Sequence, residues 1–280
     1  MKTLGYYNGQ IGELEEMKIP MLDRGAYFGD GVYDATMCAG YHIHNLEEHL
    51  DRFYRSASLL NITVPCEKDA LRTLLCALVH KLDDPDQFVY WQVTRGTALR
   101  RHAFPDCPAN LWVMLTPEKP VPLTQTYRLI SAADTRFLHC NIKTLNLIPS
   151  VMAYEQAVSR GCDEAVFHRD GIVTECAHSN IHILKNGVFY THPADCHILA
   201  GIARAHLIKM CGTLDIPVVE QPFSLDTLRQ ADEIIVSSSG DFCMRACELN
   251  GKPIGGKDPV RLKKLQDAIW QEFLEDTKQI

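Results

Sequence analysis

A single lysine stands in an otherwise apolar segment near the middle of the chain. Lys143 lies between Ile142 and Leu145 in the run Cys140-Asn141-Ile142-Lys143-Thr144-Leu145. Apolar neighbours keep water from an ammonium group and so favour the neutral amine. The neutral amine is the form that adds to a carbonyl carbon to make a Schiff base. The alternative is a lysine whose stem is buried and whose ammonium stays in water, so the interpretation depends on other residues.

An acid and a candidate anion site follow Lys143 along the chain. Glu175 lies in the apolar run Ile172-Val173-Thr174-Glu175-Cys176, where an unpaired carboxylate is costly. Gly201-Ile202-Ala203 predicts a helix start, whose free N–H groups and dipole attract an anion. Ser238 and Ser239 add hydroxyl donors in a serine-rich turn. The alternatives are a salt bridge for the acid, an ordinary helix start and an ordinary turn.

Together these three features fit one cofactor, pyridoxal 5′-phosphate. A lysine must hold its aldehyde, an acid must keep its ring nitrogen protonated, and backbone donors must hold its phosphate. Lys143, Glu175 and the helix start at Ile202 can meet these needs in turn. We therefore expect a pyridoxal-phosphate enzyme.

Composition and charge argue against several kinds of partner. The 280 residues carry a net charge of −7 and no basic run that could follow a phosphate backbone, so we expect no nucleic-acid partner. No apolar run reaches the length of a membrane span, so we expect no membrane partner. Eleven scattered cysteines and an N-terminus without a signal-peptide core indicate reduced thiols and a cytoplasmic protein. The isolated pairs His178-x3-His182 and Cys243-x3-Cys247 fall short of a four-ligand pattern, so we expect no metal site.

The elements that must position these residues form two predicted domains of the α+β class. Residues 1–116 make the first, residues 117–122 a linker with three prolines, and residues 123–280 the second, which carries Lys143. In the first domain, apolar spacing predicts a helix that begins at Asn45 and buries one face. Asn-Gly and Asp-Gly pairs predict β-hairpins. The other predicted strands are 34–37, 41–44, 88–94, 111–116, 128–132 and 233–236, and the other helices are 69–81, 149–160 and 258–276.

The chain resembles the fold-type IV pyridoxal-phosphate aminotransferases, and within them the branch that acts on D-amino acids. The similarity runs from Asp23 to the serine turn at 237–239 and is weakest after Gly240. It rests on four motifs: Phe28-Gly29-Asp30-Gly31-Val32-Tyr33, Val93-Thr94-Arg95-Gly96-Thr97, Ile142-Lys143-Thr144-Leu145-Asn146-Leu147 and Val173-Thr174-Glu175. The resemblance implies two domains with the cofactor in the cleft between them.

The resemblance also implies a role for each matching residue. Lys143 would be the Schiff-base lysine and Glu175 the partner of the pyridine nitrogen. The cofactor phosphate would be held by Arg52, Ile202, Ala203 and Ser239, with Ser238 beside them, and Leu199 would pack on the ring. The substrate carboxylate would be bound by Tyr33, Arg100 and His102. In the family the arginine and histidine come from a neighbouring subunit, which implies a homodimer. Arg136 matches a further arginine near the active site.

Three departures from the family pattern concern specificity. Arg101 occupies the middle of the Arg-x-His motif, where a small residue is usual, and residues 242–247 do not follow the family. Ala177-His178-Ser179 replaces consecutive serines after the acid. An extended strand would turn Glu175 and His178 to opposite sides, so an exposed or structural histidine is the alternative. We expect instead a local bend that brings His178 near the cofactor and makes activity pH-dependent between about 6 and 7.

The predicted activity is transamination of D-amino acids, of the type D-alanine plus 2-oxoglutarate to pyruvate plus D-glutamate. Two enzymes of the same fold are alternatives: an L-branched-chain aminotransferase and an aminodeoxychorismate lyase. The pair Arg100 and His102 argues against both, because it resembles the carboxylate-binding pair of the D-specific branch. A pyridoxal-phosphate-binding protein without turnover is the remaining alternative, and the presence of Lys143 and Glu175 argues against it.

Overall fold

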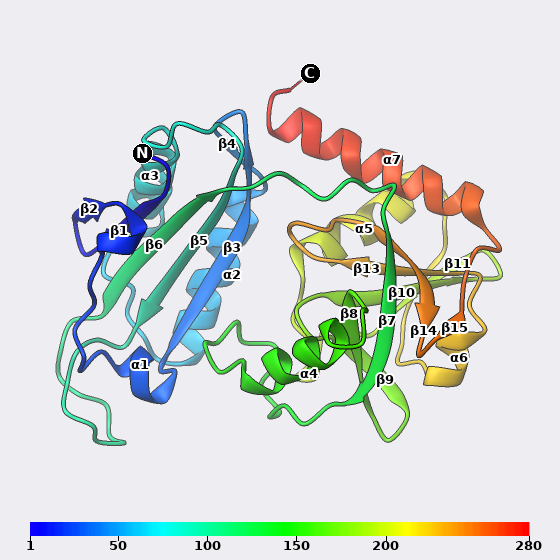
Figure 1. The fold of residues 1–280 in the computed structure, drawn as a ribbon, viewed down its shortest axis with the longest axis horizontal. Coiled ribbons are helices and arrows are strands. Elements are labelled where there is room, and N and C mark those ends of the chain that lie inside the picture. Colours follow the sequence, from blue (N-terminus) through cyan, green and yellow to red (C-terminus); the bar gives the residue numbers. More distant parts are fainter. Residues whose placement is uncertain (280) are drawn as a thin grey trace. The chain divides into compact units, whose positions relative to one another are not determined.

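The computed structural model describes residues 1–279, which divide into two compact units (Figure 1). The first unit contains residues Met1–Pro120, Ile142–Asn146 and 273–279, and the second contains Val121–Asn141 and Leu147–Glu272. The division at Pro120 falls inside the predicted proline-containing linker. Each unit combines helices with a β-sheet, so the α+β class is confirmed.

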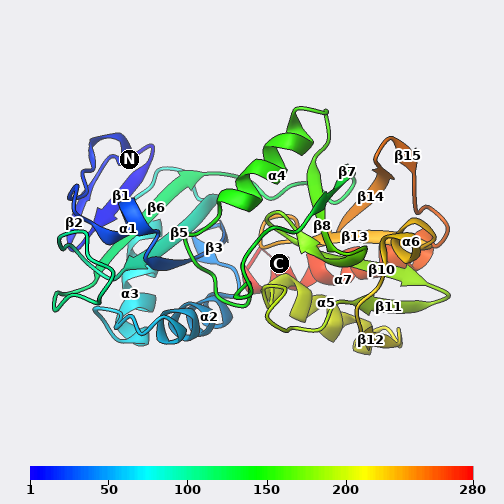
Figure 2. The same cartoon turned by 90° about the horizontal axis from the view of Figure 1, so that it is seen from below.

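Among the described residues, the first unit is built on a six-stranded antiparallel sheet. The strand order is β2-β1-β6-β5-β3-β4, and helices α2 and α3 cover one face of the sheet (Figure 2). Its core forms where Leu50 and Phe53 of α2 meet the fully buried Trp91 of β5. The elements are β1 (Leu4–Tyr7), β2 (Gln10–Gly12), a 3-10 turn (Leu14–Glu16), α1 (Arg24–Phe28), β3 (Gly31–Ala39), β4 (His42–Ile43), α2 (Leu46–Leu59), α3 (Lys68–Val79), β5 (Gln87–Thr94) and β6 (Asn110–Pro117).

The segment that carries Lys143 belongs to this first unit and not to the predicted second domain. Tyr33 N donates to Lys143 O at 2.9 Å, and Leu145 N donates to Gly31 O at 3.1 Å, so the segment pairs with the start of β3. Gly31 permits this approach, because a Cβ at that position would lie 2.7 Å from Leu145 Cδ1. Backbone pairing between residues about 110 positions apart leaves no local pattern in the sequence, which is why the prediction assigned the segment by chain order.

Within residues 1–279, the second unit is built on a nine-stranded mixed sheet. The order is β12-β11-β10-β13-β14-β7-β8-β9, with β15 paired to β14; β7 runs parallel to both β14 and β8. The elements are β7 (Thr126–Ala133), α4 (Ile148–Val158), β8 (Glu164–Arg169), β9 (Ile172–Cys176), β10 (Asn180–Lys185), β11 (Val188–Thr191), α5 (Ile202–Thr213), β12 (Val218–Glu220), α6 (Leu225–Arg229), β13 (Glu233–Ser237), β14 (Met244–Leu249), β15 (Lys252–Pro253) and α7 (Pro259–Asp276).

Both Asp-Gly and Asn-Gly hairpins of the second unit form as predicted. Asp170 and Gly171 join β8 to β9, Asn186 and Gly187 join β10 to β11, and all four residues have positive φ. A turn with positive φ at both central residues matches the twist of the strands that it connects. The first hairpin leads into β9, which carries Glu175, and the second follows β10, which begins at Asn180. No helix among residues 1–279 combines the length and hydropathy that a membrane span requires.

Candidate active site

Lys143 is held by the first unit, close to the ring of Tyr33. Its Nζ lies 4.4 Å from the centroid of the Tyr33 ring, a distance at which an ammonium is attracted to the aromatic face. Ser56 Oγ of α2 accepts from Lys143 N at 3.3 Å. The lysine is half-buried, and Tyr33 stacks on Tyr90 with ring centroids 5.3 Å apart. The amine therefore lies against the Tyr33 ring, and the lysine side chain does not extend freely into solvent.

A buried charged cluster lies on β3 and α2 in the same unit. Arg52 Nε and Nη2 donate to the two oxygens of Asp34 at 2.9 and 2.6 Å, and His49 Nδ1 lies 2.7 Å from Asp34 Oδ1. Burial alone would raise the pKa of Asp34, but Arg52 and His49 together hold it well below its usual range. Burial, helped by nearby Arg52 and Lys143, lowers the pKa of His49 to about 4 against the opposing effect of Asp34. At neutral pH the cluster therefore contains an ionised aspartate, a neutral histidine and a cationic arginine.

This cluster bears on the role predicted for Arg52. The family resemblance implies that Arg52 binds phosphate, and the structure shows it in an ion pair with Asp34. Two parallel N–H···O bonds fix the plane of the guanidinium group. The pair does not exclude a phosphate ligand, because Asp34 orients the group, and the phosphate role remains a prediction.

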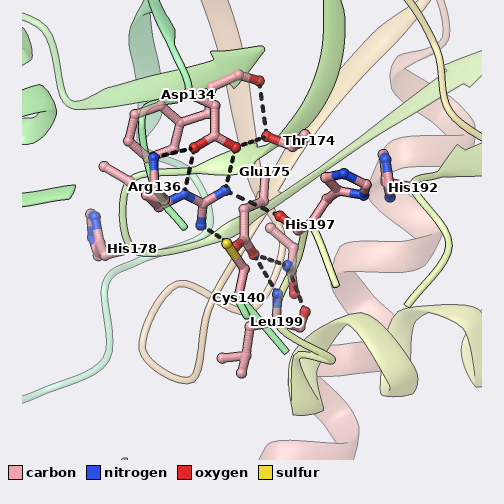
Figure 3. A network of polar contacts seen from close by, with 12 residues as sticks. Asp134, Arg136, Cys140, Thr174, Glu175, His178, His192, His197 and Leu199 are labelled. Carbon is pink, nitrogen blue, oxygen red and sulfur yellow. Dashed lines mark hydrogen bonds and ion pairs between the residues drawn. The ribbon is translucent and has the colours of Figure 1, made fainter. Parts of the chain in front are cut away.

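In the second unit, Glu175 is buried on β9 and has hydrogen-bond donors at both oxygens (Figure 3). Oε2 accepts from Asn180 Nδ2 at 2.8 Å and from Leu199 N at 3.0 Å, while Oε1 forms an ion pair with Arg136 Nη1. Burial raises the pKa of Glu175 to about 7, although Arg136 and the N–H of Leu199 act in the opposite direction. A carboxyl group of this kind can change its charge near neutral pH and can share a proton with a basic partner.

Arg136 is fixed by a second acid, Asp134. Its Nε and Nη2 each lie 2.9 Å from an oxygen of Asp134, its Nη2 donates to His197 O at 3.2 Å, and its guanidinium carbon lies 4.6 Å from the centroid of Phe167. Asp134 also accepts from Thr174, as Figure 3 shows, and from Arg169. Burial would raise the pKa of Asp134, but Arg136 and Arg169 lower it to about 2. The arginine beside Glu175 is thus held in one orientation.

The helix start predicted at Gly201-Ile202-Ala203 is present, and its role as an anion site remains a prediction. The N-cap residue Gly201 has no side chain that could cap the first turn. The first N–H groups of a helix have no partner within the helix. A Cβ at Gly201 would lie 2.0 Å from Asn180 Oδ1, so only glycine fits beside the residue that holds Glu175. Ile202 and Ala203 follow at the start of the helix, and Leu199 precedes it.

In the serine turn, the hydroxyl of Ser238 already has partners within the protein. Its hydroxyl donates to Asp241 Oδ2 at 2.8 Å and accepts from Asp241 N at 3.1 Å, while Asp241 Oδ1 accepts from the hydroxyl of Tyr127. These contacts favour the alternative in which Ser238 shapes the turn. Ser239 lies in the same turn, half-buried, and its predicted contact with phosphate is untested.

Arg100 and His102 come together on one aromatic ring in the first unit. The Arg100 guanidinium carbon lies 4.9 Å from the centroid of Phe28, and the His102 ring centroid lies 5.2 Å from it. Both side chains are exposed, and the carbonyl of Arg101 between them accepts from Arg24 at 2.6 Å. Tyr33 contacts other groups, the Tyr90 ring and Lys143. The structure therefore pairs two of the three residues predicted to bind the substrate carboxylate.

The bend predicted after Glu175 is present. Cys176 N donates to Ser179 O at 2.7 Å, which closes a turn, and His178 Nδ1 lies 2.7 Å from the buried carboxylate of Glu164. The His178 ring packs edge-on against Tyr154, and half of its side chain stays exposed. His178 is thus oriented by an acid on β8, and its influence on activity remains a prediction.

Sequence reasoning missed two residues that hold the acid. Asn180 contacts Glu175 and Leu199, and Asp134 fixes Arg136. Both carried a signal: each is a polar residue at the end of an apolar strand, where a buried polar group must find a partner. The missing information was the identity of that partner.

Comparison with known proteins defines the class that this fold and these side chains indicate, namely enzymes that transfer amino groups. The model of the family Amino-transferase class IV matches residues 31–249, and the chain belongs to this family. It is 36% identical to a D-alanine aminotransferase of Listeria monocytogenes, covering 100% of this chain and 97% of the relative. It is 34% identical to the D-alanine aminotransferase of Bacillus licheniformis, covering 99% of each chain.

Solved structures confirm the fold. A branched-chain aminotransferase from Thermoproteus uzoniensis matches with a TM-score of 0.88 at 22% identity, covering 98% of this chain and 96% of that one. The branched-chain amino acid aminotransferase of Escherichia coli matches with a TM-score of 0.88 at 22% identity, covering 98% of this chain and 95% of that one. The fold-type IV architecture predicted from the motifs is therefore confirmed.

The cofactor of this family is pyridoxal 5′-phosphate, and the residues of this chain fit it. The first unit offers an amine fixed on an aromatic ring. The second offers a buried carboxylate with donors at both oxygens and an uncapped helix start where only Gly201 fits. These are the three kinds of group that the aldehyde, the ring nitrogen and the phosphate require.

Proposed function

We propose that this enzyme transaminates D-amino acids, converting D-alanine and 2-oxoglutarate into pyruvate and D-glutamate. The observation that carries the proposal is identity of 34–38% to several D-alanine aminotransferases, in most cases over nearly the whole chain. The exposed pair Arg100 and His102 on Phe28 supports it, because a planar guanidinium binds a carboxylate through two parallel hydrogen bonds. When bound, the cofactor supplies the aldehyde that accepts the amino group and a ring that accepts electrons.

Lys143 is the residue that we propose to bond to the cofactor and to move the proton. Its Nζ is positioned by the Tyr33 ring and by backbone bonds on both sides. Once released by the incoming amine, Nζ would take the proton from the substrate α-carbon and deliver it, in the same half-reaction, to the cofactor carbon that had carried the aldehyde. A primary amine can both accept and donate a proton, so it is suited to both tasks.

Glu175 would hold a proton on the ring nitrogen. A carboxyl whose pKa is raised to about 7 is closer in acidity to a pyridine nitrogen than an ordinary glutamate is. Arg136 would keep negative charge on Glu175 Oε1, while Asn180 and Leu199 fix the position of Oε2. The phosphate would be bound by Arg52, Ile202, Ala203 and Ser239, and Leu199 would pack on the ring.

Substrate handedness would be decided by where the α-carboxylate is held. For one base to act on either enantiomer, the side chain and the carboxylate must exchange places. Tyr33, Arg100 and His102 are the residues we propose to hold that carboxylate, with Arg100 and His102 supplied by a second subunit of a homodimer. This arrangement rests on the family resemblance.

We also propose a cytoplasmic location. All eleven cysteines lie among the described residues, and each is a free thiol, as expected in a reducing compartment.

The branched-chain alternative is tested by half-reactions. The purified enzyme is mixed with D-alanine, D-glutamate, L-leucine or L-glutamate, and the change in cofactor absorbance is followed. We expect D-alanine to react faster than either L-amino acid. A preference for L-leucine or L-glutamate over every D-amino acid would contradict the proposal and favour an L-branched-chain aminotransferase.

Borohydride reduction followed by peptide mapping tests the lysine that we propose to bond to the cofactor. The reduction should tag Lys143, and a tag on another lysine would reject that assignment.

A further inference from the structure

A six-residue loop in the second unit brings together side chains of a kind that bind transition metals. It runs from His192 to His197 between β11 and the residues that hold Glu175. Among residues 1–279, the only group of three or more metal-binding side chains is His192, Asp195 and His197, whose ligand atoms all lie within 4.8 Å of one another. We propose that these three residues form a binding site for Zn²⁺.

The distances are close to those of a tetrahedral zinc site. His197 Nδ1 lies 3.2 Å from Asp195 Oδ1, and His192 Nδ1 lies 3.8 Å from the same oxygen. All three ligand atoms lie within 4.8 Å of one another. Bonds of the usual length from zinc to nitrogen and oxygen put neighbouring ligands roughly 3.3–3.6 Å apart. The distances to Asp195 Oδ1 are therefore close to ligand spacing, and shifts on the order of 1 Å or less would close the site.

The loop is already held in this shape. Arg204 Nη2 donates to His192 O at 2.9 Å, and Cys140 N donates to Cys196 O at 3.0 Å. Within the loop, Asp195 Oδ1 accepts from His197 N at 2.8 Å. The His192 ring is buried and lies edge-on to the ring of His197 at 6.1 Å between centroids, as Figure 3 shows for this pair. Little ordering would be required when the ion binds.

The ligand set favours zinc among the common divalent ions. Imidazole is a borderline ligand, whereas Ca²⁺ and Mg²⁺ require several oxygens. Binding through Nδ1 would place the ring proton of each histidine on Nε2, and His192 Nδ1 would leave the carbonyl of Pro193, now 2.9 Å away. With three protein ligands, the fourth position on the ion would be left to water.

The loop adjoins two contacts of the active-site acid. The carbonyl of His197 accepts from Arg136, and Leu199, two residues later, donates to Glu175. An ion on this loop would restrain both contacts without touching the cofactor. Sequence reasoning did not find this site, because the spacing His-x2-Asp-Cys-His lies outside the zinc patterns considered.

The test measures metal binding to the intact holoenzyme, in buffer free of amino acids and thiols. Titration with Zn²⁺ by calorimetry should show one site per chain. Titration with Co²⁺ should give visible d–d bands at longer wavelength than the cofactor absorbs. Asp195→Asn and His197→Ala change partly exposed side chains, and each should weaken binding at least tenfold.

A matched control comes from another histidine of the second unit. His206 Nδ1 lies 2.6 Å from Glu272 Oε2, a close histidine–acid pair outside the three-ligand group found among the described residues. His206→Ala should bind Zn²⁺ and Co²⁺ like the wild type. Zinc should also raise the Tm of the wild type more than that of Asp195→Asn, because a ligand that binds only the folded state stabilises it. Binding that survives in Asp195→Asn and His197→Ala, or no binding at all, would refute the proposal.

Discussion

Arg136 and Glu175 form a buried ion pair in which the arginine is itself held by Asp134. The side chains of the pair are 10% and 7% exposed, and Asp134 is inaccessible. Two opposing influences meet at Glu175, since burial raises its pKa and Arg136 lowers it. The charge state of the acid is therefore set by a residue that lies 39 positions away in the sequence.

Removal of Arg136 should affect both stability and activity. Arg136→Ala leaves a buried carboxylate without its cation, and breaking such a pair costs about 3–5 kcal/mol. The pKa of Glu175 should rise, so turnover at pH 7 should fall. Urea unfolding and kcat measure the two effects. The control is Arg169→Ala, which removes a side-chain contact to Asp134 and leaves the Arg136–Glu175 pair in place. Equal losses of kcat in both variants would argue against a specific role for Arg136.

Glu175→Gln tests the partner of the ring nitrogen. Glutamine keeps the shape but cannot carry the negative charge that stabilises a protonated ring. Turnover should fall far more than cofactor content, measured by absorbance after denaturation. Glu233→Gln is a matched control, because Glu233 is also buried in the same sheet and accepts from Gly256 N and Asp258 N. Near-normal turnover of Glu175→Gln would remove the proposed role.

Arg100→Leu should raise the Michaelis constant for D-alanine and leave the spectrum of the bound cofactor unchanged. Loss of one charge-assisted hydrogen-bond pair, about 1.5–3 kcal/mol, corresponds to roughly ten- to a hundredfold. Arg101→Leu provides the comparison, since Arg101 is held through its backbone, by Arg24 at its carbonyl and by Leu99 O at its N–H. If both substitutions have the same effect on steady-state kinetics, general surface charge explains the result better than a carboxylate site.

Asp134 gives a pH-dependent contribution to stability. Its pKa is lowered in the folded protein to about 2 from an ordinary 3.8, so the unfolded chain binds more protons between these values. The contribution, about 2 kcal/mol, is therefore present above about pH 4 and is lost as the pH falls to about 2. The stability difference between wild type and Asp134→Asn should shrink over that range. Asp226→Asn, at an exposed pair, should show no such trend in acid titrations of unfolding.

His178→Ser tests whether this histidine makes activity pH-dependent. His178 is oriented by Glu164 and faces Tyr154, and histidines ordinarily titrate between about pH 6 and 7. The profile of kcat/KM against pH should lose an inflection in that range when serine replaces it. Identical profiles for the two proteins would leave His178 a structural residue.

Local sequence patterns predicted most of the helices and hairpins, because these elements depend mainly on residues that are close together in the sequence. The hairpins at Asp170-Gly171 and Asn186-Gly187 need positive φ, and the helix α2 shows its apolar stripe in the sequence. Asn45 illustrates the limit. It does precede α2, but with φ 49° and with no capping hydrogen bond from its side chain to any described residue, so the apolar spacing located the helix start without revealing how the helix begins.

Candidate residues for the site could be named from the sequence, but their contacts could not. Lys143 and Glu175 stand out because each is a charged side chain in an apolar run. Their neighbours Asp134 and Asn180 come from other parts of the chain, and no spacing rule links them to Glu175. The pairing of Lys143 with Tyr33 is likewise a contact between distant parts of the chain. The family resemblance supplied roles where spacing could not.

The first unit is assembled from three separate pieces of the chain, and this has a consequence for biosynthesis. Residues 1–120 leave the ribosome first, yet β3 obtains its pairing with the lysine segment only when residues 142–146 appear. The last piece carries Asp276, which accepts from Asn45 N at 2.7 Å and lies 2.8 Å from His44 Nδ1. The first unit therefore cannot complete its own contacts until translation has passed residue 276, and a nascent chain arrested before that point would expose the edge where α2 begins.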